Sequence, residues 1–126
     1  MPTYPNKSTV ALRQRLLDGM VSYMQLIGKE TDNASDCGYS QQHIDRCAEI
    51  IDAYIASFVP NPKLPQNQIV AAVRQIVLDL NALNKECGGR LIETDQREYL
   101  CELILIAAKL AGLEADEDIT EEWREW

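Results

Sequence analysis

The sequence predicts an all-α protein, a four-helix bundle with a short fifth helix at the C-terminus. Four long segments repeat apolar residues at spacings of three and four, the period of an amphipathic helix. No segment of comparable length alternates apolar and polar residues, as a half-buried strand would. The chain has 126 residues, of which 46% are apolar and 25% charged. These values suit one packed domain over residues 1–126.

The first helix is expected from about Ser8 to Ile27. Ser8 or Thr9 can supply its N-cap, and Gly28 can close it in a left-handed conformation. Gly19, inside the helix, makes a close crossing with another helix plausible. The expected apolar stripe consists of Leu12, Leu16, Met20, Tyr23 and Ile27.

A polar loop over residues 28–40 precedes the second helix. Ser40 is its natural N-cap, and Pro60 and Pro62 stop it. The segment 59–65 contains three prolines and is expected to be a stiff connector. The apolar face of the second helix should comprise Ile44, Cys47, Ala48, Ile51, Tyr54, Ile55 and Phe58.

The third helix is expected to start near Pro65 and to end at Gly88 and Gly89. Asn84 lies beside its apolar seam, with Asn81 one turn earlier, and a buried amide must be hydrogen-bonded. We therefore expect a structural role for these asparagines. The seam consists of Ile69, Val73, Ile76, Leu80, Leu83 and Cys87.

The fourth helix is expected from its cap at Thr94 to Gly112. It is apolar on most of its circumference, which predicts the most buried position in the bundle. Its main apolar face is Leu100, Leu103, Ile104, Ala107 and Ala108, widened by Leu105, Ile106 and Leu110.

The last fourteen residues carry most of the net charge. They hold seven acidic residues and Arg124, so that −6 of the total charge of −8 lies in residues 113–126. A phosphate backbone calls for a basic surface, so nucleic-acid binding is not expected. The acidic end suits a basic protein partner, because opposite fields speed encounter, and it would also serve as a solubilising tail.

Two tryptophans interrupt this acidic segment. Trp123 and Trp126 share one face of the expected helix at 119–126 with Ile119, and Asp118 or Thr120 can cap it. Either both indoles dock the tail onto the bundle, or one remains exposed as an anchor for a partner. The candidate partner-binding residues are Asp116, Glu117, Asp118, Glu121, Glu122, Glu125 and Trp126.

No catalytic, cofactor-binding or metal-binding residue is expected. His43 and Cys47 are four residues apart, but a zinc site normally has at least three protein ligands, which favours a first-turn surface histidine. Glu98 and Glu102 lack the Glu-x-x-His partners of a ferritin-like site. A calcium loop starting at Asp32 fails, because its position six is not glycine and its position twelve is not glutamate.

The cysteines and the N-terminus predict a cytoplasmic protein. Cys37, Cys47, Cys87 and Cys101 show no C-x-x-C spacing and are expected to be free thiols. No signal peptide is expected, because no apolar region follows the lysine near the N-terminus, and no apolar stretch is long enough for a membrane span.

By size, charge and a helical pattern ending in EEWREW, the chain resembles small, acidic, all-helical bacterial proteins of uncharacterised function. Some proteins of that type are immunity partners of secreted bacterial toxins. The resemblance implies a non-enzymatic protein that binds another protein through an acidic surface, with toxin neutralisation as one version. The alternative is a small-molecule- or metal-binding helical domain, with or without enzymatic activity, which an accessible polar cavity inside the bundle would favour.

Overall fold

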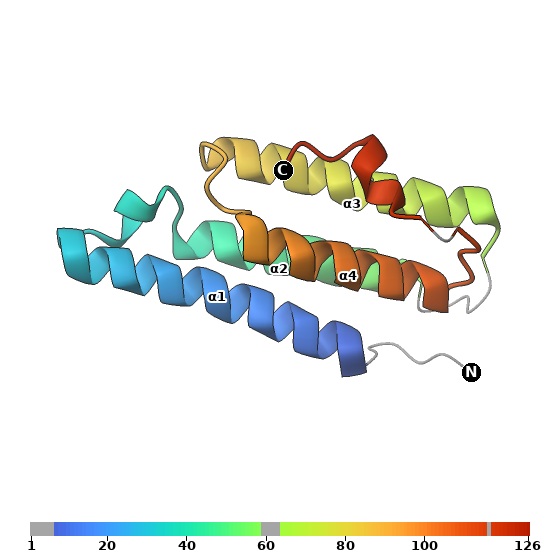
Figure 1. The fold of residues 1–126 in the computed structure, drawn as a ribbon, viewed down its shortest axis with the longest axis horizontal. Coiled ribbons are helices and arrows are strands. Elements are labelled where there is room, and N and C mark those ends of the chain that lie inside the picture. The colour runs from blue at the N-terminus through green and yellow to red at the C-terminus, as the bar shows by residue number, and fades with distance from the viewer. Residues whose placement is uncertain (1–6, 59–63, 116) are drawn as a thin grey trace.

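A computed structural model describes residues 7–58, 64–115 and 117–126, and within these ranges every regular element is helical. This confirms the predicted all-α bundle (Figure 1). The elements in chain order are α1 (Lys7–Thr31), the 3₁₀ helix η1 (Ala34–Cys37), α2 (Gln41–Ala56), α3 (Gln66–Glu86), α4 (Thr94–Leu110) and the 3₁₀ helix η2 (Ile119–Glu122). Most of the expected proline-rich connector lies outside the described residues.

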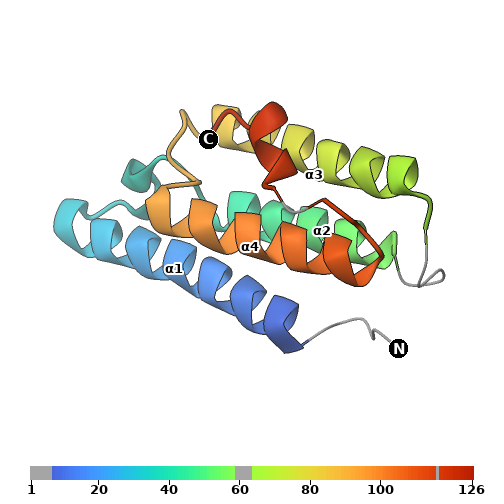
Figure 2. The same ribbon diagram turned by 45° about the vertical axis from the view of Figure 1, so that its right-hand side comes forward.

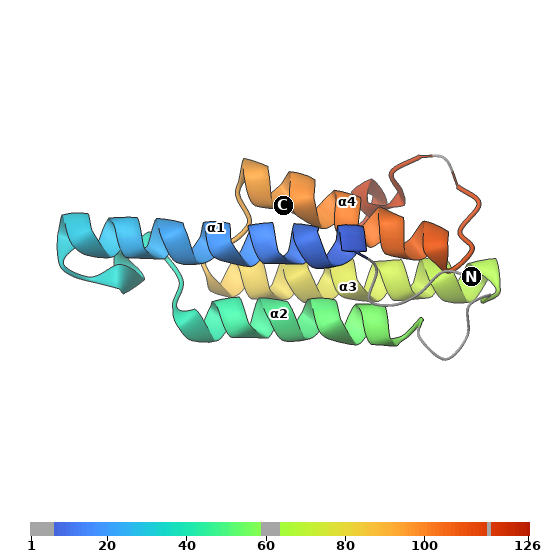
Figure 3. The same cartoon turned by 90° about the horizontal axis from the view of Figure 1, so that it is seen from below.

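The four long helices alternate in direction and form a ring of neighbours. Helix α1 packs between α2 and α4, and α3 packs against the same two helices from the opposite corner (Figures 1 and 3). The tail that carries η2 returns from the end of α4 and lies on α3, as Figure 2 also shows.

Apolar side chains fill the interior, largely as the sequence predicts. The α4 face of Leu100, Leu103, Ile104, Ala107 and Ala108 is wholly buried, and so is the predicted seam of α3. The predicted stripe of α1 is correct only in its first part. Tyr23 is 44% exposed and Ile27 is partly buried. The reason is that the C-terminal end of α1 runs past the start of α4, so α4 does not cover this end of the helix (Figure 3). Instead, the short helix η1 packs against it.

Two predicted helix ends are wrong by a residue or a turn. Helix α1 continues through Gly28 to Thr31, whose hydroxyl donates to the Ile27 carbonyl over 2.9 Å, and Asp32 takes the left-handed conformation instead, with φ of 62°. Glycine inside a helix costs only about 1 kcal/mol, so it does not force a stop. Helix α4 has Glu93, rather than Thr94, at its N-cap.

Buried hydrogen bonds tie the helices to their neighbours. The Tyr54 hydroxyl on α2 donates to the Ile104 carbonyl on α4 over 2.7 Å. The Asn84 side chain is buried, and its oxygen accepts from the backbone N–H of Ile92 over 2.9 Å. Asn84 thereby holds the turn between α3 and α4, which is the structural role predicted for it.

Candidate functional site

The C-terminal tail begins with a capped turn. Asp118 is the N-cap of η2, and its Oδ1 accepts from the Thr120 N–H over 2.9 Å and from the Thr120 hydroxyl. Thr120 is wholly buried and is the only buried residue of this turn. The cap at Asp118 agrees with the sequence prediction. The element itself is a single 3₁₀ turn, so the expected α-helical face over 119–126 does not form.

Asn81 on α3 holds the backbone of the tail from both sides. Its Nδ2 donates to the Trp123 carbonyl over 2.8 Å, and its Oδ1 accepts from the Glu125 N–H over 3.1 Å. The side chain is only 8% exposed. The sequence predicts a structural role for Asn81 but gives no sign of its partners, which lie more than forty residues away along the chain.

The Arg124 side chain contacts polar groups of the tail and of α4. Its guanidinium lies 3.5 Å from the Asp118 carboxylate and 3.8 Å from that of Glu121, and it contacts the Cys101 sulfur on α4. It also lies over the Trp126 ring, 5.4 Å from the centroid, in a cation–π arrangement. The Arg124 side chain is 17% exposed, so the one basic residue of this segment serves the tail itself.

Burial keeps the neighbouring thiol protonated. Burial raises the pKa of Cys101 above its usual value, although the hydroxyl of Thr120 and the charge of Arg124 act in the other direction. The thiolate is the nucleophilic form of cysteine, so this environment does not activate Cys101.

Both indoles pack against the bundle. Ile119, Trp123 and Trp126 are partly buried and contact the core, as expected for a docked tail. Neither tryptophan is among the large exposed apolar residues, so the structure shows the docked arrangement, and the use of Trp126 as a contact for a partner stays a prediction. The Nε1 of Trp126 is buried and has no hydrogen-bond partner within the described part of the chain.

The predicted acidic residues fall into two groups. Asp118 belongs to the cap and the ion pair with Arg124, so its carboxylate is structural. Asp116 lies outside the described residues. The exposed carboxylates are those of Glu117, Glu121, Glu122 and Glu125. Four of the candidate acidic residues therefore lie at the protein surface.

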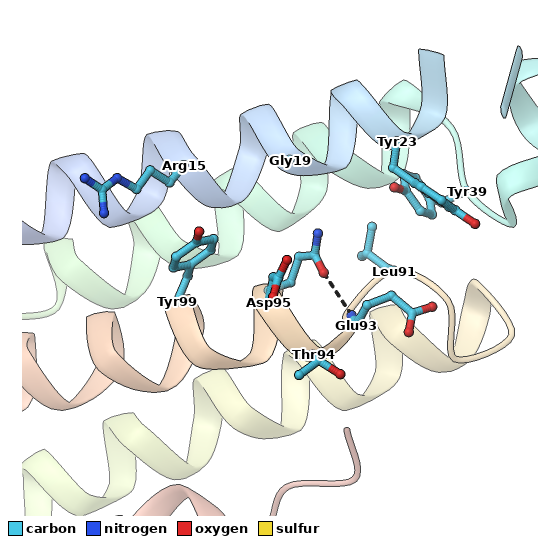
Figure 4. Close-up of a pocket in the computed structure, with 10 residues that line it drawn as sticks. Arg15, Gly19, Tyr23, Tyr39, Leu91, Glu93, Thr94, Asp95 and Tyr99 are labelled. Carbon is cyan, nitrogen blue, oxygen red and sulfur yellow. Dashed lines mark hydrogen bonds between the residues drawn. The ribbon is translucent and has the colours of Figure 1, made fainter. Parts of the chain in front are cut away.

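A second feature is a pocket of about 610 Å³ between α1 and the start of α4 (Figure 4). Tyrosines from three separate segments line it, together with Gly19 of α1 and the first turn of α4. A Cβ atom added to Gly19 would meet only the Gln96 amide at 3.5 Å, so this glycine borders open space and does not mark a close helix crossing. Sequence reasoning missed the pocket because its walls meet only in the folded chain.

His43 has the local role expected of a first-turn residue. Its Nδ1 accepts from the Ser40 backbone N–H over 3.0 Å and lies 3.1 Å from the Ser40 hydroxyl. This contact closes the N-terminus of α2 and occupies one of the two ring nitrogens. Within the described ranges, no group of three or more His, Cys, Asp or Glu side chains is arranged to hold a metal ion.

No protein-family model, curated protein or solved structure matches the chain. Among the helices that the structure describes, none combines the length and the apolar character needed to cross a bilayer.

Proposed function

We propose that this protein is a non-enzymatic binding module of the cytoplasm that engages a basic protein through its acidic C-terminal tail. Neutralisation of a toxin is one concrete form of this function, in line with the proteins that the sequence resembles. The observation that carries the proposal is that different residues attach the tail and form its charged surface. Asn81, Thr120 and the indoles attach it, while four glutamates stay at the surface.

The electrostatics support a basic partner. Exposed carboxylates on a fixed segment produce a local negative field, and such a field raises the rate of encounter with a positive surface. They add little stability of their own, since surface ion pairs contribute at most about 1 kcal/mol. A binding role thus accounts for their number better than a stabilising role does.

The bundle interior supports a binding module over an enzyme. Leu16, Met20, Ile69, Leu103 and Ile104 are wholly buried, and the residues around them are also apolar. The pocket between α1 and α4 lies at the surface of the bundle and not within it.

The proposal is tested by capturing the partner from the native cell and then measuring its association rate with three forms of the protein. The parent is compared with a tail variant, Glu117→Gln/Glu122→Gln/Glu125→Gln. The matched control is Glu30→Gln/Glu49→Gln/Glu86→Gln, which makes the same change in net charge at exposed positions of α1, α2 and α3.

We expect the tail variant to associate several-fold more slowly than the control at low salt and to converge with it at high salt, because salt screens the field. Equal rates for the tail variant and the control would contradict the assignment of the binding surface to the tail. A captured partner without an excess of basic residues would contradict the proposed electrostatic complementarity.

A further inference from the structure

The N-terminus of α2 is capped by the only histidine of the chain. The Nδ1 atom of His43 accepts from the Ser40 backbone N–H over 3.0 Å, so this nitrogen carries no proton of its own. A protonated imidazole has an N–H at both nitrogens and accepts no hydrogen bond. The contact at the start of α2 therefore exists only while the ring is neutral.

The Ser40 amide cannot follow the ring, because the chain on both sides of it is anchored. Before it, Tyr39 is 3% exposed, and its hydroxyl donates to the Met20 carbonyl of α1 over 2.9 Å. After it, the Ser40 carbonyl accepts from the backbone N–H groups of His43 and Ile44 over 3.1 and 3.2 Å. The Ser40 hydroxyl, 3.1 Å from Nδ1, can rotate to donate or to accept, so it tolerates both states of the ring. Only the backbone contact discriminates between them.

Two electrostatic environments act on a charged His43 ring in opposite ways. In the capping position, the imidazolium would lie at the positive end of the α2 dipole, where a cation is unfavourable. The residue also borders a surface pocket of about 440 Å³ formed by α2 and α3, which run side by side (Figure 3). The charged residues around this pocket are Asp45, Arg46 and Glu49 of α2 and Glu86 of α3, all of them exposed. Three carboxylates against one guanidinium leave the pocket negative, so it favours the charged ring.

We propose that His43 is a pH-operated switch with two positions. The neutral ring caps α2 at Ser40, and the protonated ring leaves the cap and turns toward the carboxylates of the pocket, with Glu86 as its partner on α3. Histidine is the side chain that changes charge between pH 5 and 8. The cap is therefore complete at pH 8 and is lost as the pH falls toward 5, which loosens the first turn of α2. The switch works without a partner protein, so it stands apart from the role proposed for the tail.

The test follows the full chain by NMR between pH 5 and 8, with His43→Gln as the matched control. Glutamine at this position is a usual partner in a capping box, and its amide oxygen accepts throughout this pH range. In the parent, the Ser40 amide proton should move upfield as the His43 ring takes up its proton, because the amide loses its acceptor. In His43→Gln the same proton should stay in place. A ring that titrates without moving the Ser40 signal, or an equal movement in both proteins, would overturn the switch.

Amide exchange measures how far the first turn opens. The Ile44 N–H donates to the Ser40 carbonyl over 3.2 Å, so its exchange reports on this turn. At pH 5 it should exchange about fivefold faster in the parent than in His43→Gln, the factor that corresponds to a lost cap of about 1 kcal/mol. At pH 8 the two proteins should exchange alike. Equal rates at both pH values would show that the protonated ring leaves the turn closed, and the opening of α2 would be refuted.

A second pair of variants tests the outer position of the ring. Glu86→Gln removes the carboxylate on α3, so the protonated ring loses a partner. The midpoint of the Ser40 transition should then fall by about 0.4 pH unit, the shift that corresponds to a surface ion pair of about 0.5 kcal/mol. The matched control is Glu102→Gln, the same change at an exposed position of α4, which should leave the midpoint in place. The same midpoint in both variants would overturn the assignment of Glu86.

Discussion

Replacing Asn81 with alanine should release the C-terminal tail. The side chain is 8% exposed, donates to the Trp123 carbonyl over 2.8 Å and accepts from the Glu125 N–H over 3.1 Å. Each hydrogen bond contributes about 1 kcal/mol net, so their joint loss should cost about 2 kcal/mol. Backbone groups left unpaired would cost more if they stayed buried, but a released tail exposes them to water. For a chain of this length, the loss corresponds to a melting temperature roughly 8 °C lower.

The assay separates the tail from the bundle. Trp123 and Trp126 are the only tryptophans, so their fluorescence reports on the tail, while circular dichroism at the helical wavelength reports on the bundle. In the Asn81→Ala variant, the fluorescence transition should precede the loss of helix. The matched control is Asn67→Ala, the same substitution at an exposed position of α3, which should change the stability by less than about 0.5 kcal/mol.

A double-mutant cycle supplies the decisive comparison. Asn81 and Trp123 hold the same segment, one through the backbone and one through packing. Once Trp123→Ala has loosened that segment, Asn81→Ala should cost clearly less than it does in the parent, so the two effects should not add. Strict additivity, or an Asn81→Ala variant that melts like Asn67→Ala, would refute the view that Asn81 latches the tail.

Three further predictions concern stability. Trp123→Ala should cost roughly 2–3 kcal/mol in thermal unfolding, below the usual cost for a core aromatic residue because the indole is only partly buried; an unchanged melting temperature would contradict docking. Gly19→Ala should raise the stability to urea by about 0.5–1 kcal/mol, since the new methyl group meets only Gln96, at 3.5 Å. Burial raises the pKa of Cys47 to about 12 and that of Cys87 to about 11, from 9.0, so the stability that this protonation provides is complete below about pH 9 and is lost as the pH rises further. For each thiol, the free energy of unfolding should fall by at most about 1.4 kcal/mol per pH unit. Urea unfolding between pH 8 and 11 should therefore show a smaller decrease in this free energy for Cys47→Ala than for the parent.

The fold was largely predictable because the helices are amphipathic along nearly their whole length. Residues such as Val73, Leu80 and Leu103 recur at helical spacing and are wholly buried. Helix ends were less predictable, because they depend on contacts beyond local propensity. Gly28 has the sequence features of a C-cap, yet α1 extends past it to where η1 packs on α1, and Tyr23 follows the apolar stripe but is 44% exposed.

The tail was predictable in its local features and not in its attachments. Asp118 as a cap and the docking of Trp123 follow from neighbouring residues in the sequence. Nothing in the spacing of Asn81 or Cys101 indicates that they meet residues 123–125, because only the folding of α3, α4 and the tail brings them together. Arg124 is a similar case. The sequence shows one basic residue among acidic ones, and the structure shows that its guanidinium pairs with Asp118 and lies over the Trp126 ring.

The way the tail is held has a consequence for how salt acts on the protein. A tail held mainly by ion pairs would loosen as salt screens them. Here Asn81 makes two neutral hydrogen bonds to the backbone, Thr120 is wholly buried and the indoles pack on the bundle, so most of the attachment is insensitive to salt. Salt should therefore slow association with a basic partner while the tryptophan fluorescence of the unbound protein stays constant. If the fluorescence of the unbound protein changes in step with the association rate, salt acts by detaching the tail, and the steering argument loses its support.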